Sequence, residues 1–311
     1  MLNAQTRQHA VACCILAALL GCFGSAQAEQ PAKILVLNSD ASVEKYRLPQ
    51  EEFTQAVGLP VIEINLAEKK WKRADLEELF YDEEPDVVYC IGTKSYLLAQ
   101  KYAGKIPVVF SSIINWLRLP VSKQMYGVSN ELHAGMEMML FRYIFPNIQT
   151  IGVLYSRKYT QEWLQTAAVQ GKELGLSLVA HELNANESLE HALKRFPANM
   201  NAFWLIPDPL VMSTSQDLQT ILAFCDARKI PVFSYHEAFA GYGAALAVSV
   251  DAPTIGRQAA AITSSVLAGE QLPERVQFPA GSYITLNLKK ITEYNVAYNQ
   301  DALGSVNAIL K

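Results

Sequence analysis

Short apolar runs rich in β-branched residues recur along the chain from residue 33 onward, and each is followed by a turn and an amphipathic stretch. We interpret nine of these runs as strands: 33–37, 61–64, 86–91, 106–110, 151–155, 177–180, 202–206, 230–233 and 244–250. Several are apolar without alternation, which is typical of strands that helices cover on both faces. The rhythm therefore predicts an α/β fold built from βαβ units.

The length of 311 residues exceeds the size at which a single hydrophobic core stops growing, which favours two packed lobes. The two halves echo each other: IPVVF at 106–110 precedes two serines, and IPVF at 230–233 precedes Ser234 and Tyr235. We expect two doubly wound lobes of four or five strands each.

Three segments are predicted to cross between the lobes: YGVSN at 126–130, a second near 249–250, and a third near 281–286. With these crossings, lobe 1 comprises residues 29–128 and 251–281. Lobe 2 comprises residues 129–250 and 282–311.

The N-terminus has the pattern of an export signal. Arg7 precedes an apolar run at 11–23, and Ala26-Gln27-Ala28 offers small residues at the positions that a signal peptidase reads. The run is shorter than the ~20 residues needed to cross a bilayer. We expect a signal peptide at 1–28, cleavage after Ala28 and a soluble periplasmic protein. The segment 19–22 also resembles a lipobox, which would instead make an acylated Cys22 the new N-terminus.

Charge and cysteine content exclude several classes of protein. Loss of the leader removes Arg7 and no acidic residue, so the formal charge changes from −4 to −5. The sequence has no stripe of basic residues of the kind that would indicate nucleic-acid binding. Two cysteines, Cys90 and Cys225, remain after the leader, without CxxC or metal spacing. We expect two buried thiols. A disulfide between them is the alternative.

The sequence contains no motif of a catalytic, metal or cofactor site. It lacks GxSxG, HExxH, a phosphate-binding loop and a complete GxGxxG, and the histidines after the leader are scattered at 133, 181, 191 and 236. We therefore expect no catalytic residues, no metal and no cofactor.

The clearest helical pattern lies at 136–145. Met136, Met139, Leu140, Tyr143 and Ile144 recur at helical spacing. We expect this stripe to pack on a sheet.

An ordered set of segments resembles a known family, the substrate-binding proteins of ABC importers that include tryptophan- and tyrosine-binding members. The segments that carry the resemblance are 91–93, 106–110, 152–155, 207–211, 230–233, 255–260 and 284–288. The resemblance implies a periplasmic binding protein type I fold, with two Rossmann-like lobes, three hinge crossings and a ligand enclosed when the lobes close. It also implies a permease and an ATPase as partners.

The family usually carries Thr-Asp-Pro after the strand equivalent to 106–110, whereas this chain has Ile114, Asn115 and Trp116 there. An acid for a ligand's ammonium is therefore missing at that place.

Candidate ligand-binding residues follow the strands, because ligands of open α/β sheets bind beyond the carboxyl ends of the strands. The candidates are Ser39, Thr93, Ser112, Asn115, Trp116, Tyr155, Asp208, Tyr235, His236 and Asp251. Thr93 suits a carboxylate at a helix N-terminus, with helix capping as the alternative. Asp208 is either a ligand contact or an ordinary turn residue. Asp251 either reaches the cleft or caps the helix that follows.

The expected function is capture of a small amphipathic ligand, an amino acid or a related carboxylate, by a monomer that serves an ABC importer and performs no chemistry. A sensor component that serves a histidine kinase or a receptor is the alternative, since both use the same closure around ligand.

Overall fold

The computed structural model describes residues 31–311. The predicted signal peptide, its cleavage after Ala28 and the lipobox cysteine Cys22 lie outside these residues and stay predictions. Within the described range, no helix is both long and apolar enough to cross a membrane.

The first sheet has six parallel strands in the order β11-β5-β4-β3-β1-β2. Its strands are β1 (Ile34–Asn38), β2 (Val61–Asn65), β3 (Val87–Ile91), β4 (Val108–Ser111), β5 (Met125–Val128) and β11 (Val276–Gln277). Helices cover both faces: α2 (Glu44–Val57) and α10 (Ala252–Leu267) on one, α3 (Arg73–Glu83) and α4 (Thr93–Tyr102) on the other. Successive residues of β3 therefore point into two different cores, Tyr89 into the first and Cys90 into the second.

The second sheet has seven strands in the order β13-β12-β10-β9-β8-β6-β7. They are β6 (Thr150–Tyr155), β7 (Ser177–Glu182), β8 (Ala202–Leu205), β9 (Val232–Ser234), β10 (Leu246–Val250), β12 (Ser282–Asn287) and β13 (Ala308–Leu310). Only the β10–β12 pair is antiparallel.

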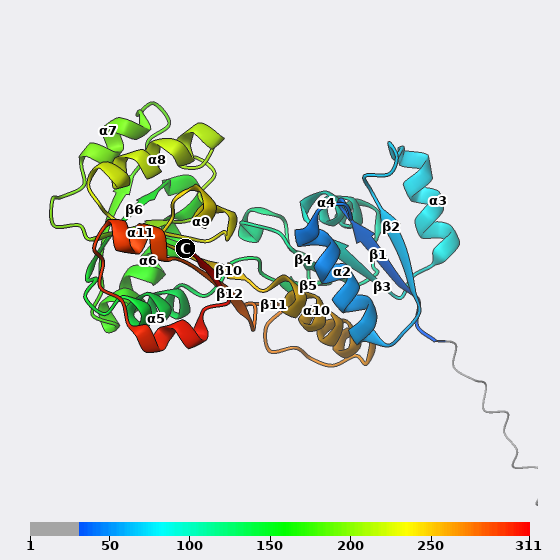
Figure 1. Ribbon diagram of the computed structural model, residues 1–311. Helices are drawn as coiled ribbons and strands as arrows, with labels where there is room; N and C mark the ends of the chain where they lie inside the picture. Colours follow the sequence, from blue (N-terminus) through cyan, green and yellow to red (C-terminus); the bar gives the residue numbers. More distant parts are fainter. Residues whose placement is uncertain (1–30) are drawn as a thin grey trace, which may run out of the picture. The chain divides into compact units, whose positions relative to one another are not determined.

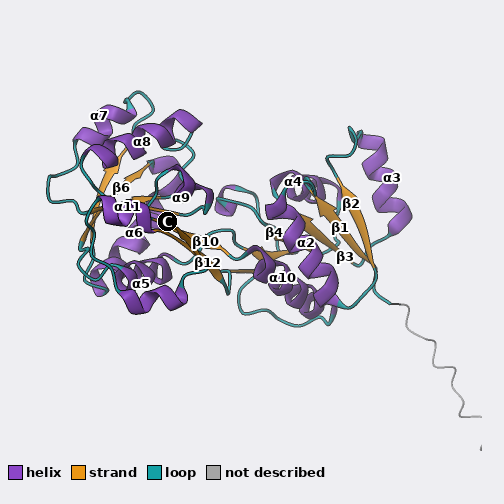
Figure 2. Cartoon of the chain, viewed as in Figure 1, coloured by secondary structure: helices purple, strands orange, loops and turns teal. Residues whose placement is uncertain are grey.

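Helices cover this sheet on both faces as well. Its helices are α5 (Ala134–Ile144), α6 (Arg157–Glu173), α7 (Leu189–Lys194), α8 (Ser215–Ala227), α9 (Ala238–Tyr242) and α11 (Leu288–Glu293). Two 3₁₀ helices, η1 (Trp116–Arg118) and η2 (Gln300–Ser305), complete the described elements. Figure 2 shows the alternation of helices and strands along the chain. The predicted α/β class with two doubly wound, mainly parallel sheets is confirmed, but the sheets have six and seven strands and not the four or five expected.

Three connections join the sheets and are hydrogen-bonded to one another. They follow β5, β10 and β11. The Ser129 amide donates to the Gln277 carbonyl (2.9 Å), and the Asp251 amide donates to the Gly281 carbonyl (3.2 Å). The lobe boundaries at 128, 250 and 281 stay a prediction.

The second connection leads into α10, which returns to pack on α2 of the first sheet (Figure 1). Gly256 makes this approach close, because a Cβ at that position would overlap the carbonyl oxygen of Pro49. A residue without a side chain is needed where the two helices touch.

The helix predicted at 136–145 is α5, and its predicted buried face is confirmed in part, since Ile144 is buried and Met136 and Leu140 pack against the same core. Met139 and Tyr143, both in the predicted stripe, are 53% and 46% exposed. The buried face instead includes Glu137, Met138 and Phe141. Glu137 is only 6% exposed, which the spacing of the apolar residues did not indicate.

Cys90 and Cys225 are both buried and unpaired, one in each sheet's core. Burial raises the pKa of both thiols, which keeps them protonated. The alternative of a disulfide is therefore not what the structure shows.

Candidate functional site

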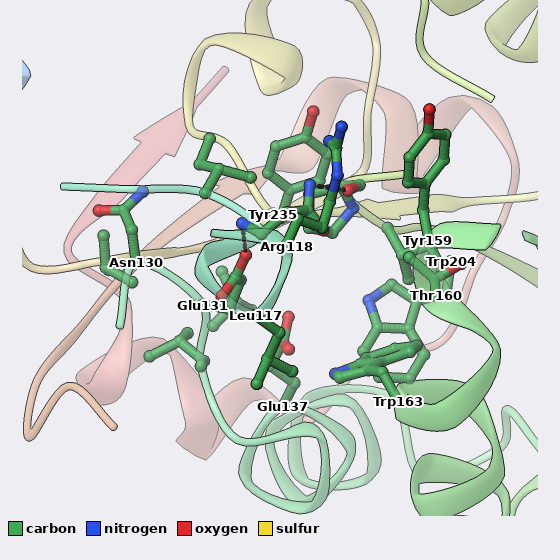
Figure 3. Close-up of a pocket in the computed structure, with 17 residues that line it drawn as sticks. Leu117, Arg118, Asn130, Glu131, Glu137, Tyr159, Thr160, Trp163, Trp204 and Tyr235 are labelled. Carbon is green, nitrogen blue, oxygen red and sulfur yellow. Dashed lines mark hydrogen bonds between the residues drawn. The ribbon is translucent and has the colours of Figure 1, made fainter. Parts of the chain in front are cut away.

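A pocket with aromatic walls lies at the carboxyl ends of strands from both sheets, and 17 residues line it (Figure 3). We call it the aromatic pocket, after Tyr159, Trp163, Trp204 and Tyr235. The space that no atom fills is about 760 Å³, including volume open to solvent.

The four aromatic side chains come from three neighbouring elements of the second sheet. Tyr159 and Trp163 are one helical turn apart on α6, Trp204 lies on β8, and Tyr235 follows β9. The Trp163 and Trp204 rings meet edge to face, with centroids 5.0 Å apart. Burial raises the pKa of Tyr235, so its hydroxyl stays neutral and can donate a hydrogen bond. The wall is rigid and apolar, with few polar tips.

Two carboxyl groups also line the pocket, Glu131 in the connection after β5 and Glu137 in the first turn of α5 (Figure 3). Glu131 accepts a hydrogen bond from the Asn115 amide and another from the Ser129 hydroxyl (3.0 Å). Burial raises the pKa of Glu131. Burial also raises the pKa of Glu137, the nearby Glu131 charge raises it further, and a hydrogen bond from Trp204 opposes both.

The loop after β4 brings the first sheet to the pocket. Asn115 has left-handed backbone geometry (φ 56°), and its side-chain amide donates to the Pro207 carbonyl after β8 (2.8 Å). The Arg118 guanidinium lies 4.2 Å from the centroid of the Tyr159 ring. Leu117 lines the pocket although it is 73% exposed. This loop therefore contacts the second sheet at two points and supplies a positive charge and an apolar side chain.

A second hollow adjoins the aromatic pocket and shares Ile114, Asn130, Tyr235 and Val250 with it. Further walls come from the start of α2, from His236 and from the stretch 249–253. Burial lowers the pKa of His236. The nearby Glu237 charge raises this pKa, and the Lys45 charge lowers it. The imidazole of this hollow is thus mainly neutral near pH 7.

A sequence model described as ABC transporter substrate binding protein matches residues 63–308, which is most of the chain. The chain belongs to this family. No curated protein matches it in sequence.

Solved structures support the fold of this substrate-binding protein. A Streptococcus pneumoniae ABC domain in complex with L-Trp is 17% identical with a TM-score of 0.58, and the match covers 89% of this chain and 100% of that one. A conserved domain protein from Vibrio cholerae is 18% identical with a TM-score of 0.58, covering 90% and 100%. A ligand-free, open substrate-binding protein with adhesive properties from Clostridium difficile is 15% identical with a TM-score of 0.68, covering 90% and 99%. Together they show the two-lobed type I periplasmic binding protein fold.

Four of the ten residues proposed from sequence line one of the two hollows of this substrate-binding protein. Asn115 and Tyr235 line the aromatic pocket. Tyr235 also lines the adjoining hollow, together with His236 and Asp251. Asp251 in addition caps α10, because its carboxylate accepts from the Thr254 amide (3.0 Å) and hydroxyl.

Asp208 lines neither hollow and has another task. It is fully buried, and its carboxylate accepts hydrogen bonds from the Ser156 amide (2.7 Å), the Ser156 hydroxyl (2.7 and 2.9 Å) and the Thr160 hydroxyl (2.5 Å). The Leu210 amide donates to it as well (2.9 Å). Asp208 thus ties the start of α6 to the turn after β8, and it holds in place the helix that carries Tyr159 and Trp163.

The remaining five predicted residues also lie outside both hollows. Thr93 is exposed as the first residue of α4, where Gly92 is the N-cap. The hydroxyl of Ser39 accepts from the Ser95 amide (3.1 Å), and that of Ser112 donates to the Lys45 carbonyl (3.4 Å). Trp116 and Tyr155 pack against the hydrophobic cores.

Sequence reasoning missed the residues of the pocket that lie on helices, inside a crossing or within a strand: Arg118, Glu131, Glu137, Trp163 and Trp204. Glu137 did carry a signal, since it is the only charged residue between positions 132 and 141 of an apolar helical stretch. Among residues 31–311, no group of three or more His, Cys, Asp or Glu side chains could hold a metal ion.

Proposed function

We propose that this substrate-binding protein captures a small amphipathic ligand, an amino acid or a related carboxylate, in the aromatic pocket. The observation that carries the proposal is that elements of both sheets line one pocket: Arg118 follows β4 of the first sheet, and Trp163 and Trp204 belong to the second. A ligand held there contacts both sheets at once. Its binding energy is therefore available to favour one arrangement of two lobes over another.

The lining supports the proposed ligand class. Four aromatic rings offer a large apolar area, while Arg118 and the two glutamates offer charges of both signs in the same pocket. An amino acid with an apolar side chain carries matching groups. A sugar would instead need many hydrogen-bonding side chains, and this pocket is walled mainly by rings and aliphatic groups.

The proposal includes the setting in which the protein works. The lobes are residues 29–128 with 251–281 and residues 129–250 with 282–311, in a periplasmic monomer. The partners are the permease and ATPase of an ABC importer. The ligand leaves chemically unchanged.

A thermal-shift screen of the exported protein tests the binding role, with amino acids, organic acids, nucleosides and sugars as the compounds. A ligand at 100 times its Kd stabilises the folded state by about 2.7 kcal/mol through mass action. We expect shifts with amino acids or related carboxylates. Shifts with sugars alone contradict the ligand class, and no shift with any compound contradicts the binding role.

Two further measurements separate the remaining roles. Mass spectrometry of a hit after long incubation with the protein should recover it intact, and a new product would show catalysis. Uptake of the labelled hit should fall in cells that lack the protein. Unchanged uptake despite tight binding would favour the sensor role.

A further inference from the structure

Glu137 is an acidic side chain for which the protein supplies no positive partner. It is 6% exposed, and the ion pairs formed within residues 31–311 include neither Glu137 nor Glu131. Elsewhere the chain does pair its acids, as in the contact of Asp226 with Lys290 (2.6 Å). Two carboxyl groups without a cation in one buried pocket are costly to keep, since burial disfavours the charged form and like charges repel.

The one basic side chain among the 17 lining residues does not relieve this cost. The Arg118 guanidinium is stacked over Tyr159 and forms no ion pair with either glutamate. Glu131 is fixed by donors from Asn115 and Ser129, which orient it without neutralising it. The pocket therefore offers two carboxyl groups to a cation that a ligand brings, and such a cation would favour their charged form.

The aromatic wall of the pocket also suits a cation. Trp163 and Trp204 line the pocket beside Glu137, to which Trp204 donates a hydrogen bond (Figure 3). Indole faces attract cations through their quadrupole more strongly than other rings do. A group held between carboxylates and indoles is thus favoured when it is positively charged and partly apolar.

We propose that Glu131 and Glu137, together with Trp163 and Trp204, form the binding site for the ammonium group of an amphipathic amine. This inference rests on the proposed function and sharpens it, because it makes the ammonium the essential group of the ligand and the carboxylate dispensable. Glu131 and Glu137 would also replace the acid for a ligand's ammonium that is missing from the loop at 113–116. A ligand with only a carboxylate would meet the glutamates with like charge, and a neutral ligand would leave them without a counter-charge.

The test uses matched compounds that differ in charge at one position. Tryptamine is compared with tryptophol, phenethylamine with 2-phenylethanol, and choline with 3,3-dimethylbutanol, with L-tryptophan against indole-3-propionate as a fourth pair. Calorimetric titration of the exported protein gives each Kd. We expect one or more ammonium compounds to bind at least tenfold more tightly than their uncharged or deaminated partners.

Glu137→Gln and Glu131→Gln identify the groups responsible. Loss of one member of a buried charge pair costs about 2 kcal/mol or more, so each variant should weaken the ammonium compounds by roughly 30-fold or more and leave the others unchanged. Glu162→Gln removes the same charge from an exposed position of α6 and is the matched control. Its affinities should equal those of the unmodified protein. Circular dichroism melting of each variant checks that it folds.

The outcomes separate this inference from the proposed function. Equal or tighter binding of the neutral or deaminated partners overturns the inference, as does unchanged amine affinity in both glutamine variants. If amines fail to bind while another class of compound in the thermal-shift screen succeeds, the ammonium site is wrong and the binding role stands. If no compound binds in either experiment, the proposed function itself fails.

Discussion

Glu137 places a carboxyl group in the helix layer of the second sheet, beside Trp204 and close to the charge of Glu131. Both burial and that charge raise its pKa, so the folded protein holds a proton that the unfolded chain releases. The residue therefore favours ligand binding at a cost to the stability of the empty protein.

The pH dependence of unfolding tests this cost. Below the pKa of the unfolded chain, about 4.3, Glu137 is protonated in both states and contributes nothing. Above it, the folded state binds more protons than the unfolded state, so stability falls as the pH rises toward the pKa of the folded protein. Glu137→Gln should remove this fall and raise the Tm by roughly 2–4 °C near pH 8, for a gain of about 1 kcal/mol.

Thermal melts of both proteins between pH 4 and 8, without ligand, give the comparison. The two curves should converge at low pH and separate as the pH rises. Parallel curves would contradict an elevated pKa of Glu137.

Asp208 differs from Glu137 because it stabilises the fold. Its carboxylate accepts hydrogen bonds from groups of the protein itself. Asp208→Asn places an NH₂ group against donors from Ser156, Thr160 or Leu210. Leaving such groups unsatisfied in the interior should cost about 2–4 kcal/mol of unfolding free energy. Urea denaturation measures the loss, and Asp82→Asn on the exposed side of α3 should change it by less than about 0.5 kcal/mol. A fully stable Asp208→Asn protein would argue against this structural role.

Among elements, the strands were the most predictable from sequence and the helix faces the least. All nine predicted runs contain a strand, because apolar β-branched segments between turns have few alternatives in an α/β chain. β5 and β12 were predicted as crossings instead, since their polar residues and glycines obscure the pattern. The buried face of α5 was predicted only in part, because the spacing of apolar residues does not show that Glu137 is buried.

The difference between strands and helix faces also explains which residues of the candidate site could be predicted. The rule that ligands bind after strand ends reaches Asn115, Tyr235, His236 and Asp251, which follow or end strands. It cannot reach Trp163 on α6 or Trp204 within β8, because which side of those elements faces the pocket depends on packing between distant segments.

The close contact between helices α2 and α10 predicts how substitutions of glycine affect stability. Gly256→Ala inserts a methyl group against the Pro49 carbonyl and should destabilise the protein by about 1–3 kcal/mol. Gly241→Ala in α9, where no atom lies within 4 Å of the added Cβ, should instead be neutral or stabilise by up to about 1 kcal/mol. Urea denaturation of both variants should give opposite signs, and equal effects would contradict close packing at Gly256.

At the scale of the whole molecule, two sheets with helices on both faces and three mutually bonded connections match the family to which the chain belongs. Length and strand rhythm were enough to predict this architecture. The lining of the aromatic pocket was not predictable, since it comes from a loop, a crossing, two helices and two strands that only the folded chain assembles.

The position of signal-peptide cleavage is a prediction about the whole molecule. Mass spectrometry of protein from the periplasm should find Glu29 as the first residue if Ala28 is the cleavage site. Cys22→Ala should then leave export unchanged. An acylated Cys22 at the N-terminus, and loss of membrane attachment in Cys22→Ala, would support the lipobox instead.

The central claim is that the aromatic pocket holds the ligand. Calorimetric titration with the compound that gives the largest thermal shift should show one site per chain, and Trp163→Ala should weaken it by roughly 30-fold or more, since truncating a buried aromatic anchor costs about 2 kcal/mol or more. Unchanged affinity in Trp163→Ala, with the variant folded, would place the ligand elsewhere and contradict the account.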